Sequence, residues 1–222
     1  MMMRNVMQEE LQALEEALQV EGRLVLEAIG LARTTLVNGD RVLAEKLIDF
    51  DEQVDLLYLQ VEQGIETLLA RQTPVAGDLR LVLAMLHINL HLERMADYCV
   101  TIAKLVSLSS ELRSDDDLTA KFDEMAERAS DMLEVAMGAL RERDQQAAES
   151  LVEMDGFINR HNRKVVERVM DLGVDPEIRE WGLRMVLVSR CLERIGDHVV
   201  DVGERTAYLV SGEFREFTDA SE

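Results

Sequence analysis

Apolar residues recur at alternating spacings of three and four along six long stretches of the chain. This spacing places them on one side of an α-helix, so each stretch predicts an amphipathic helix that buries one face. The first stretch runs from Met7 to Leu36 and ends at the turn VNGD (37–40), which is typical of a helix end. The apolar runs of the other five start at Leu43, Met85, Leu118, Leu151 and Met185.

The same pattern is written twice. LERMADYCV (92–100) corresponds to LERIGDHVV (192–200) at an offset of 100. At an offset of 104, Asp40, Ala44, Glu45, Leu47 and Asp51 correspond to Asp144, Ala148, Glu149, Leu151 and Asp155. Both prolines also fall at matching places, since Thr73-Pro74 and Asp175-Pro176 each predict a helix N-cap followed by a proline at the first helical position.

The repeat predicts an all-α protein made of two tandem three-helix bundles. Three amphipathic helices joined by short turns form an up-down-up antiparallel bundle, and each copy of the repeat supplies three. We predict the first repeat at residues 1–108 and the second at 118–212. The polar stretch SSELRSDDD (109–117) is predicted to connect them, and residues 213–222 to form a tail.

Composition narrows the class of protein. With 24 basic and 44 acidic residues the formal net charge is −20, which disfavours binding to a phosphate backbone. This charge fits either a soluble protein that repels its own kind or one that attracts cations. We see no signal peptide and no uncharged apolar run of about 18 residues, so we expect a cytoplasmic chain that does not span a membrane. Cys99 and Cys191 belong to no metal-ligand spacing and are expected to be buried, reduced thiols.

Acidic residues recur beside the apolar stripes at helical spacing. Two of these sets lie in each half: Asp51 with Asp55 and Glu93 with Asp97 in the first, and Asp155 with Asn159 and Glu193 with Asp197 and Asp201 in the second. Like charges four residues apart destabilise a helix by roughly 0.2–0.5 kcal/mol per pair. Because every set follows residues of the apolar stripe, we expect these side chains to be partly desolvated and to need a positive partner.

Antiparallel packing of neighbouring helices would bring the two sets of each half together. Four or five oxygen-bearing side chains at one place suit a divalent or trivalent metal ion with oxygen ligands, such as iron, Mg²⁺, Mn²⁺ or Ca²⁺. The alternative is that the acids form ion pairs with basic neighbours, for which Arg94 and Arg194 are candidates. Each arginine directly follows a glutamate and projects about 100° away from it, so we expect the arginines to face elsewhere.

The four histidines argue against the common carboxylate enzymes. The sequence has no HExxH and no glutamate followed three residues later by histidine, which disfavours a ferritin-like di-iron protein. We expect His87 and His91 to lie off the acidic flank and to pack or hydrogen-bond between helices. His198 follows Asp197 directly and is expected to point away from it.

Several of these motifs resemble the PhoU family. ERMADYCVTIAK (93–104) and ERIGDHVVDVGE (193–204) are similar to the two copies of that family's E/D-x-x-x-D motif, and DEQVD (51–55) and DGFIN (155–159) resemble its upstream motifs. ARQTPVAGDLRLVLAMLHI (70–88) and AYLVSGEF (207–214) are similar to the flanking segments, so the resemblance covers nearly the whole chain. Asn159 stands in place of a second acid, and Thr101 stands where the second half has Asp201.

The resemblance implies two three-helix bundles, dimerisation and multinuclear metal clusters bound by the acidic motifs. It also implies a cytoplasmic regulator, not an enzyme, that contacts the phosphate ABC transporter and a phosphate-sensing histidine kinase and represses the phosphate-starvation response. The residues themselves leave two alternatives open. One is a metal-dependent hydrolase or oxidase built on the same carboxylates, for which no general base is evident. The other is a metal-free helical scaffold whose acids are solvated.

Overall fold

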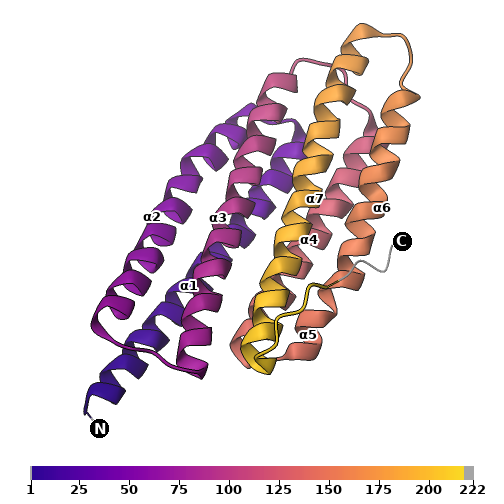
Figure 1. Ribbon diagram of the computed structural model, residues 1–222. Helices are drawn as coiled ribbons and strands as arrows, with labels where there is room; N and C mark the ends of the chain where they lie inside the picture. Colours follow the sequence, from indigo (N-terminus) through magenta and orange to yellow (C-terminus); the bar gives the residue numbers. More distant parts are fainter. Residues whose placement is uncertain (1, 218–222) are drawn as a thin grey trace.

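The computed structural model describes residues 2–217, and these form helices joined by short turns. The first half holds α1 (Met2–Asn38), α2 (Arg41–Arg71) and α3 (Gly77–Ser109). The second half holds α4 (Asp116–Glu142), the short α5 (Gln145–Glu149), α6 (Leu151–Met170) and α7 (Pro176–Ser211). The predicted all-α class and the two three-helix halves are confirmed, and the two bundles lie side by side as one elongated body (Figure 1).

The repeat is visible in the turns as well as in the helices. Gly39 and Arg143 occupy equivalent positions at an offset of 104, and both adopt a left-handed backbone with φ of 61° and 58°. The next residue in each half caps the following helix. Asp40 Oδ1 accepts hydrogen bonds from the backbone N–H groups of Val42 and Leu43, and Asp144 Oδ1 accepts one from Ala147. The same turn chemistry therefore reverses the chain in both halves.

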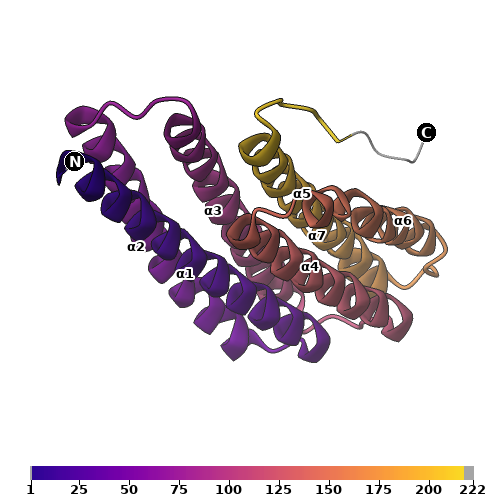
Figure 2. The same cartoon turned by 90° about the horizontal axis from the view of Figure 1, so that it is seen from below.

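The two halves share one hydrophobic core. Buried apolar residues of α1, α3, α4 and α7 belong to a single cluster, with α2 packed on α1 and α3 and with α6 packed on α4 and α7. Figure 2 shows the outer positions of α2 and α6. The third helices of the two halves, α3 and α7, run antiparallel, and contacts at both ends show this. Arg184 near the start of α7 donates to the carbonyl of Leu108 near the end of α3. At the other end, Arg80 near the start of α3 lies against Gly212, which follows α7. This antiparallel pair is the main contact between the halves.

The second half interrupts its second helix. The fifth apolar run starts at Leu151 and forms α6, and the short α5 precedes it across a break at Ser150, whereas the counterpart α2 is continuous. The Ser150 hydroxyl donates to the carbonyl of Ala147, a local bond that competes with the helical pattern. The break also lies where the backbone approaches α7: a Cβ added to Gly203 would come within 2.9 Å of the Ala148 carbonyl oxygen.

The predicted start of α3 is wrong. Pro74 lies in the loop, and the helix starts at Gly77 after Ala76, whose φ of 48° interrupts a right-handed helix. A turn in which the Asp78 N–H donates to the Val75 carbonyl precedes it. The matching expectation for Pro176 is confirmed, since Asp175 caps α7 and the proline follows at its first position. No helix within residues 2–217 has an apolar stretch long enough to cross a membrane.

Candidate functional site

Four predicted ligands of the first half meet where α2 packs on α3. We call Asp51 and Asp55 of α2 with Glu93 and Asp97 of α3 the first acid cluster. Burial, together with the charges of Asp55 and Asp97, raises the pKa of Asp51 to about 6. Burial also raises the pKa of Glu93, with smaller contributions from Asp97, Asp55 and Asp51. The four carboxylates are thus close enough for each α2 acid to act on an α3 acid.

Arginines lie closer to these acids than we expected. Arg94 Nε lies 3.5 Å from Glu93 Oε2, and its Nη1 lies 3.4 Å from Asp97 Oδ2. In the second half Arg194 Nη1 lies 3.1 Å from Asp197 Oδ2. The expectation that both arginines face away from the acids is therefore wrong. A long arginine side chain can lie along its own helix and reach the residue three positions later. These pairs are half-exposed, and such pairs contribute at most about 1 kcal/mol.

The predicted ligands of the second half lie where α6 packs on α7, and one of them is far more buried than its counterpart. We call Asp155, Asn159, Glu193 and Asp197 the second acid cluster. Asp155 is only 3% exposed and accepts a hydrogen bond of 2.6 Å from the Asn159 side-chain amide. The Asn159 amide faces Asp155 as a donor, so its carbonyl oxygen is the atom left for a cation.

A glycine makes room for this buried carboxylate. An ideal Cβ built on Gly196 would come within 2.4 Å of Asp155 Oδ1, closer than real Cβ contacts allow. Gly196 lies between Glu193 and Asp197 on α7, so Asp155 points at the segment that carries the other acids. The first half has Ala96 at the equivalent position, and there Asp51 remains half-buried. The glycine therefore explains why the two clusters differ in depth.

The ionised forms of Glu193 and Asp197 are disfavoured by burial at the contact between α6 and α7. Burial raises the pKa of Glu193, and the neighbouring charge of Asp197 adds to the effect. Arg190 pairs with one carboxylate oxygen of Glu193, whereas the other, Oε2, is buried and accepts no hydrogen bond from the residues described. Burial likewise raises the pKa of Asp197. An oxygen of this kind is the donor that a hard cation would satisfy.

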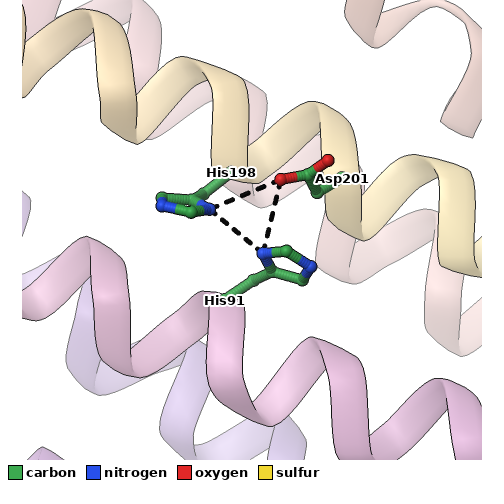
Figure 3. Close-up of side chains that lie close together, drawn as sticks. All are labelled: His91, His198 and Asp201. Atoms are coloured by element: carbon green, nitrogen blue, oxygen red, sulfur yellow. Dashed lines mark hydrogen bonds and ion pairs between the residues drawn. The ribbon is translucent and has the colours of Figure 1, made fainter. Parts of the chain in front are cut away.

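Asp201 of α7 faces α3 of the first half. Its Oδ2 atom lies 3.4 Å from the Nδ1 atoms of both His198 and His91, at the contact between α7 and α3 (Figure 3). The two Nδ1 atoms are 3.0 Å apart, so His91 bonds between helices as we expected. Thr101, which replaces Asp201 in the first half, donates instead to the backbone carbonyl of Asp97. We call His91, His198 and Asp201 the interhelix triad.

One buried acid was missed from the sequence. Glu21 of α1 is fully buried, and neither carboxylate oxygen has a hydrogen-bond partner among the described residues. Burial, with a smaller contribution from the charge of Glu93, raises the pKa of Glu21 to about 9, so Glu21 lies near the first acid cluster. The sequence does indicate this burial, since Glu21 interrupts the apolar stripe between Leu18 and Val25. The equivalent residue of the second half, at an offset of 104, is Met125.

Both acid clusters fit an oxygen-ligated metal ion by their chemistry. Each combines carboxylates from two helices, at least one of which is desolvated, and each lacks sufficient positive charge from protein groups. Hard cations take carboxylate and carbonyl oxygens, and their binding offsets the repulsion between neighbouring acids. Side chains from α2 and α3, or from α6 and α7, would hold such an ion and tie the two helices together.

The comparisons with known proteins agree with the repeated architecture. The family model described as the PhoU domain matches twice, at residues 18–106 and 122–206. The chain belongs to the PhoU domain family. The two matched segments correspond to the two three-helix halves of the structure, and they include every member of both acid clusters and of the interhelix triad.

Named members of the PhoU family align over almost the whole chain. The phosphate-specific transport system accessory protein PhoU homolog of Borreliella burgdorferi is 31% identical over 218 residues, covering 96% of this chain and 98% of that protein. The homolog of Pseudomonas putida is 28% identical and covers 91% of this chain and 80% of its own. Their names describe accessory proteins of phosphate transport.

Two solved PhoU structures have the same fold. The crystal structure of PhoU from Pseudomonas aeruginosa superposes with a TM-score of 0.86 at 26% identity, covering 93% of this chain and 99% of its own. That of the phosphate transport system regulatory protein PhoU from Streptococcus pneumoniae superposes with a TM-score of 0.85 at 27% identity, covering 94% and 99%. The elongated pair of bundles is thus shared with both.

Gly196→Ala is expected to lower the free energy of unfolding by about 1–3 kcal/mol, because its Cβ would collide with the buried Asp155 carboxylate. Gly30→Ala in α1 is the matched control. Nothing lies within 4 Å of a Cβ there, so the substitution should raise stability by about 0.5–1 kcal/mol through helix propensity. Urea denaturation monitored by circular dichroism measures both. Equal stabilisation by the two substitutions would contradict the close approach of Asp155 to Gly196.

Glu21→Met, which installs the residue found in the second half, is expected to stabilise the metal-free protein more at pH 8 than at pH 5. Between its unfolded pKa of 4.5 and its folded pKa of about 9, Glu21 is protonated when folded and ionised when unfolded. The unfolded state then binds fewer protons, so stability falls as pH rises, by at most about 1.4 kcal/mol per unit.

The control for this substitution is Glu27→Met, which replaces an exposed acid on the same helix. Urea denaturation of all three proteins at a series of pH values isolates the contribution of Glu21, because the other acids are common to them. A stabilisation by Glu21→Met that does not change between pH 5 and pH 8 would show that Glu21 is not a buried, protonated acid.

Proposed function

We propose that this protein is a metal-binding cytoplasmic regulator of phosphate uptake. It contacts the phosphate ABC transporter and a phosphate-sensing histidine kinase, and it represses the phosphate-starvation response when phosphate is sufficient. The observation that supports this most directly is alignment over 96% of the chain with a protein named as an accessory protein of the phosphate-specific transport system. The elongated helical body has the form of an adaptor between partners, and we propose that it acts as a homodimer.

The metal in this proposal has a structural or switching role. A cation at each acid cluster would supply positive charge where the protein supplies too little, and it would join carboxylates that otherwise repel one another. In the second cluster Glu193 would contribute the buried Oε2 atom, Asp197 a second carboxylate and Asn159 its side-chain carbonyl. The donor set is all oxygen, which favours iron, Mg²⁺, Mn²⁺ or Ca²⁺.

The two clusters would respond differently to metal. The first presents four carboxylates, of which Asp55 and Asp97 are exposed, so a cation can reach it from solvent. The second exchanges one acid for Asn159 and buries Asp155, which reduces its charge and its access. We therefore propose that the first cluster exchanges metal more readily, while the second holds its helices together more permanently. Changes in occupancy would alter the stiffness of the surface offered to partners.

Replacing both Glu193 and Asp197 by alanine is expected to lower the metal content of the purified protein. It should also abolish the part of the thermal stability that depends on metal at the second cluster. Without metal the double variant should be no less stable than the wild type, because it removes two acids whose ionised forms are disfavoured by burial. Elemental analysis and thermal unfolding with and without a chelator measure these quantities.

The matched control is Glu45→Ala with Asp49→Ala, an exposed pair of acids four residues apart on α2. This variant should retain wild-type metal content and the full response to chelation. If the Glu193 and Asp197 double variant also kept both, the second cluster would not be a metal site. Purification of the wild type without stoichiometric metal would favour the metal-free scaffold, and turnover of phosphate esters or oxygen by the loaded protein would favour an enzyme.

A tagged copy of the chain is expected to co-purify with the phosphate ABC transporter and the sensor kinase from membranes of its own host grown in high phosphate. Deletion of its gene should then switch on the phosphate-starvation genes in the same medium, which messenger RNA quantification measures. Normal repression in the deletion strain, or a tagged chain that brings down neither protein, would contradict the regulatory proposal while leaving metal binding open.

A further inference from the structure

The interhelix triad brings three metal-ligand atoms together at the boundary of the two halves. His91 Nδ1 and His198 Nδ1 are 3.0 Å apart, and each is 3.4 Å from Asp201 Oδ2 (Figure 3). In the part of the chain that the structure describes, it is the one group of three or more histidine, cysteine or acidic residues whose ligand atoms all lie within 4.8 Å of one another. The acid clusters are looser than this.

We propose that His91, His198 and Asp201 form a third metal site, which binds one divalent transition ion of the Zn²⁺ type and links α3 to α7. The site differs from the two acid clusters in its donors, in the pair of helices that it joins and in its position between the halves. It goes beyond the proposed function and does not depend on it, because it rests only on the arrangement of these three side chains.

The size of the triad fits a tetrahedral ion. With bonds of about 2.0–2.1 Å to nitrogen and oxygen, neighbouring ligands of tetrahedral Zn²⁺ lie about 3.3 Å apart. The observed edges of 3.0, 3.4 and 3.4 Å form one face of such a tetrahedron with little movement of the side chains. The fourth position would be open to water, since the three side chains are 15%, 21% and 41% exposed in the order His91, His198 and Asp201.

The donor types select a different ion from that of the acid clusters. Two imidazoles and one carboxylate suit Zn²⁺, Ni²⁺ or Cu²⁺, whereas Mg²⁺ and Ca²⁺ prefer oxygen ligands throughout. Imidazole binds metal in its neutral form. Asp201 supplies the negative charge that a cation needs between two neutral rings.

In the metal-free protein the same geometry is that of a hydrogen bond between the two rings. At 3.0 Å, one Nδ1–H donates to the other Nδ1. Metal binding would require that ring to carry its proton on Nε2, so that both Nδ1 lone pairs face the ion and neither ring changes its charge. The ring-to-ring hydrogen bond is therefore the competing state, and an experiment must distinguish a site that binds metal from a pair that only hydrogen-bonds.

The internal repeat does not reproduce the triad at the equivalent positions of the two halves. At an offset of 100, His198 and Asp201 correspond to Tyr98 and Thr101, and His91 corresponds to Cys191. Tyrosine and threonine are poor ligands for Zn²⁺, so the equivalent position lacks a matching donor set. The residues at the equivalent positions of α3 also suggest the substitutions for a test, namely His198→Tyr and Asp201→Thr.

Chelator-stripped protein titrated with Co²⁺, a spectroscopic substitute for Zn²⁺, tests the site. The wild type is expected to develop the strong visible absorption of four-coordinate Co²⁺ at one equivalent, and Zn²⁺ should displace it. His91→Gln, His198→Tyr and Asp201→Thr should each weaken Co²⁺ binding at least about tenfold. A variant with Glu193→Gln and Asp197→Asn should keep the band, because the oxygen-rich cluster is a separate site.

His161→Gln is the matched control. His161 of α6 is a half-buried histidine whose Nε2 lies 3.1 Å from the Glu124 carboxylate, but among the described residues it belongs to no group of three ligands. Its loss should leave Co²⁺ binding unchanged, and circular dichroism confirms that each variant is folded. Absence of the four-coordinate band in the wild type would overturn the proposal, as would its survival in His91→Gln. Zn²⁺ should raise the melting temperature of the wild type but not of His91→Gln.

Discussion

The antiparallel packing of α3 against α7 is the contact on which the other features of this protein depend. It buries the third helix of each half in one shared core, so that neither bundle stands alone. Each of these helices then has one face in the shared core and another face toward the outer helix of its own half. A narrow strip of the helix surface forms the boundary between these two faces. The candidate ligands Glu93, Glu193 and Asp197 lie on that boundary, where water is partly excluded, and Asp97 lies at its exposed edge.

Charge placed on such a boundary is unfavourable unless something compensates for it. The raised pKa values of Asp51 and Glu193 record this cost, and the arginines nearby offset only part of it, because ion pairs at half-exposed positions contribute little. A chain selected only for stability would place apolar residues at such buried positions. The second half does so at Met125, which is the sequence equivalent of the buried acid Glu21. The acids therefore carry a cost in stability that apolar residues would avoid, and the proposed metal ions would offset that cost.

The two halves show how one architecture holds two different sites. Replacing Ala96 by a glycine at position 196 admits a carboxylate into the helix contact, so Asp155 is buried where Asp51 is not. The second half has Asp201 where the first half has Thr101, and this additional acid faces His91 of the other half. Small changes in side-chain volume and polarity thus separate the halves in depth, charge and donor type while the backbone keeps its repeat.

The sequence by itself determined the helical class, the repeat, and the face of each helix on which the acids lie, because helical periodicity and offset matching are local properties. Tertiary structure alone decided what each side chain meets. The position of Asp201 at His91 depends on the angle at which α7 meets α3, and the burial of Asp155 depends on the space above Gly196. The contact of Arg94 with Asp97 depends on the conformation of the arginine side chain. Spacing along a chain specifies a face of a helix, whereas the neighbour at that face is set by packing between helices distant in sequence.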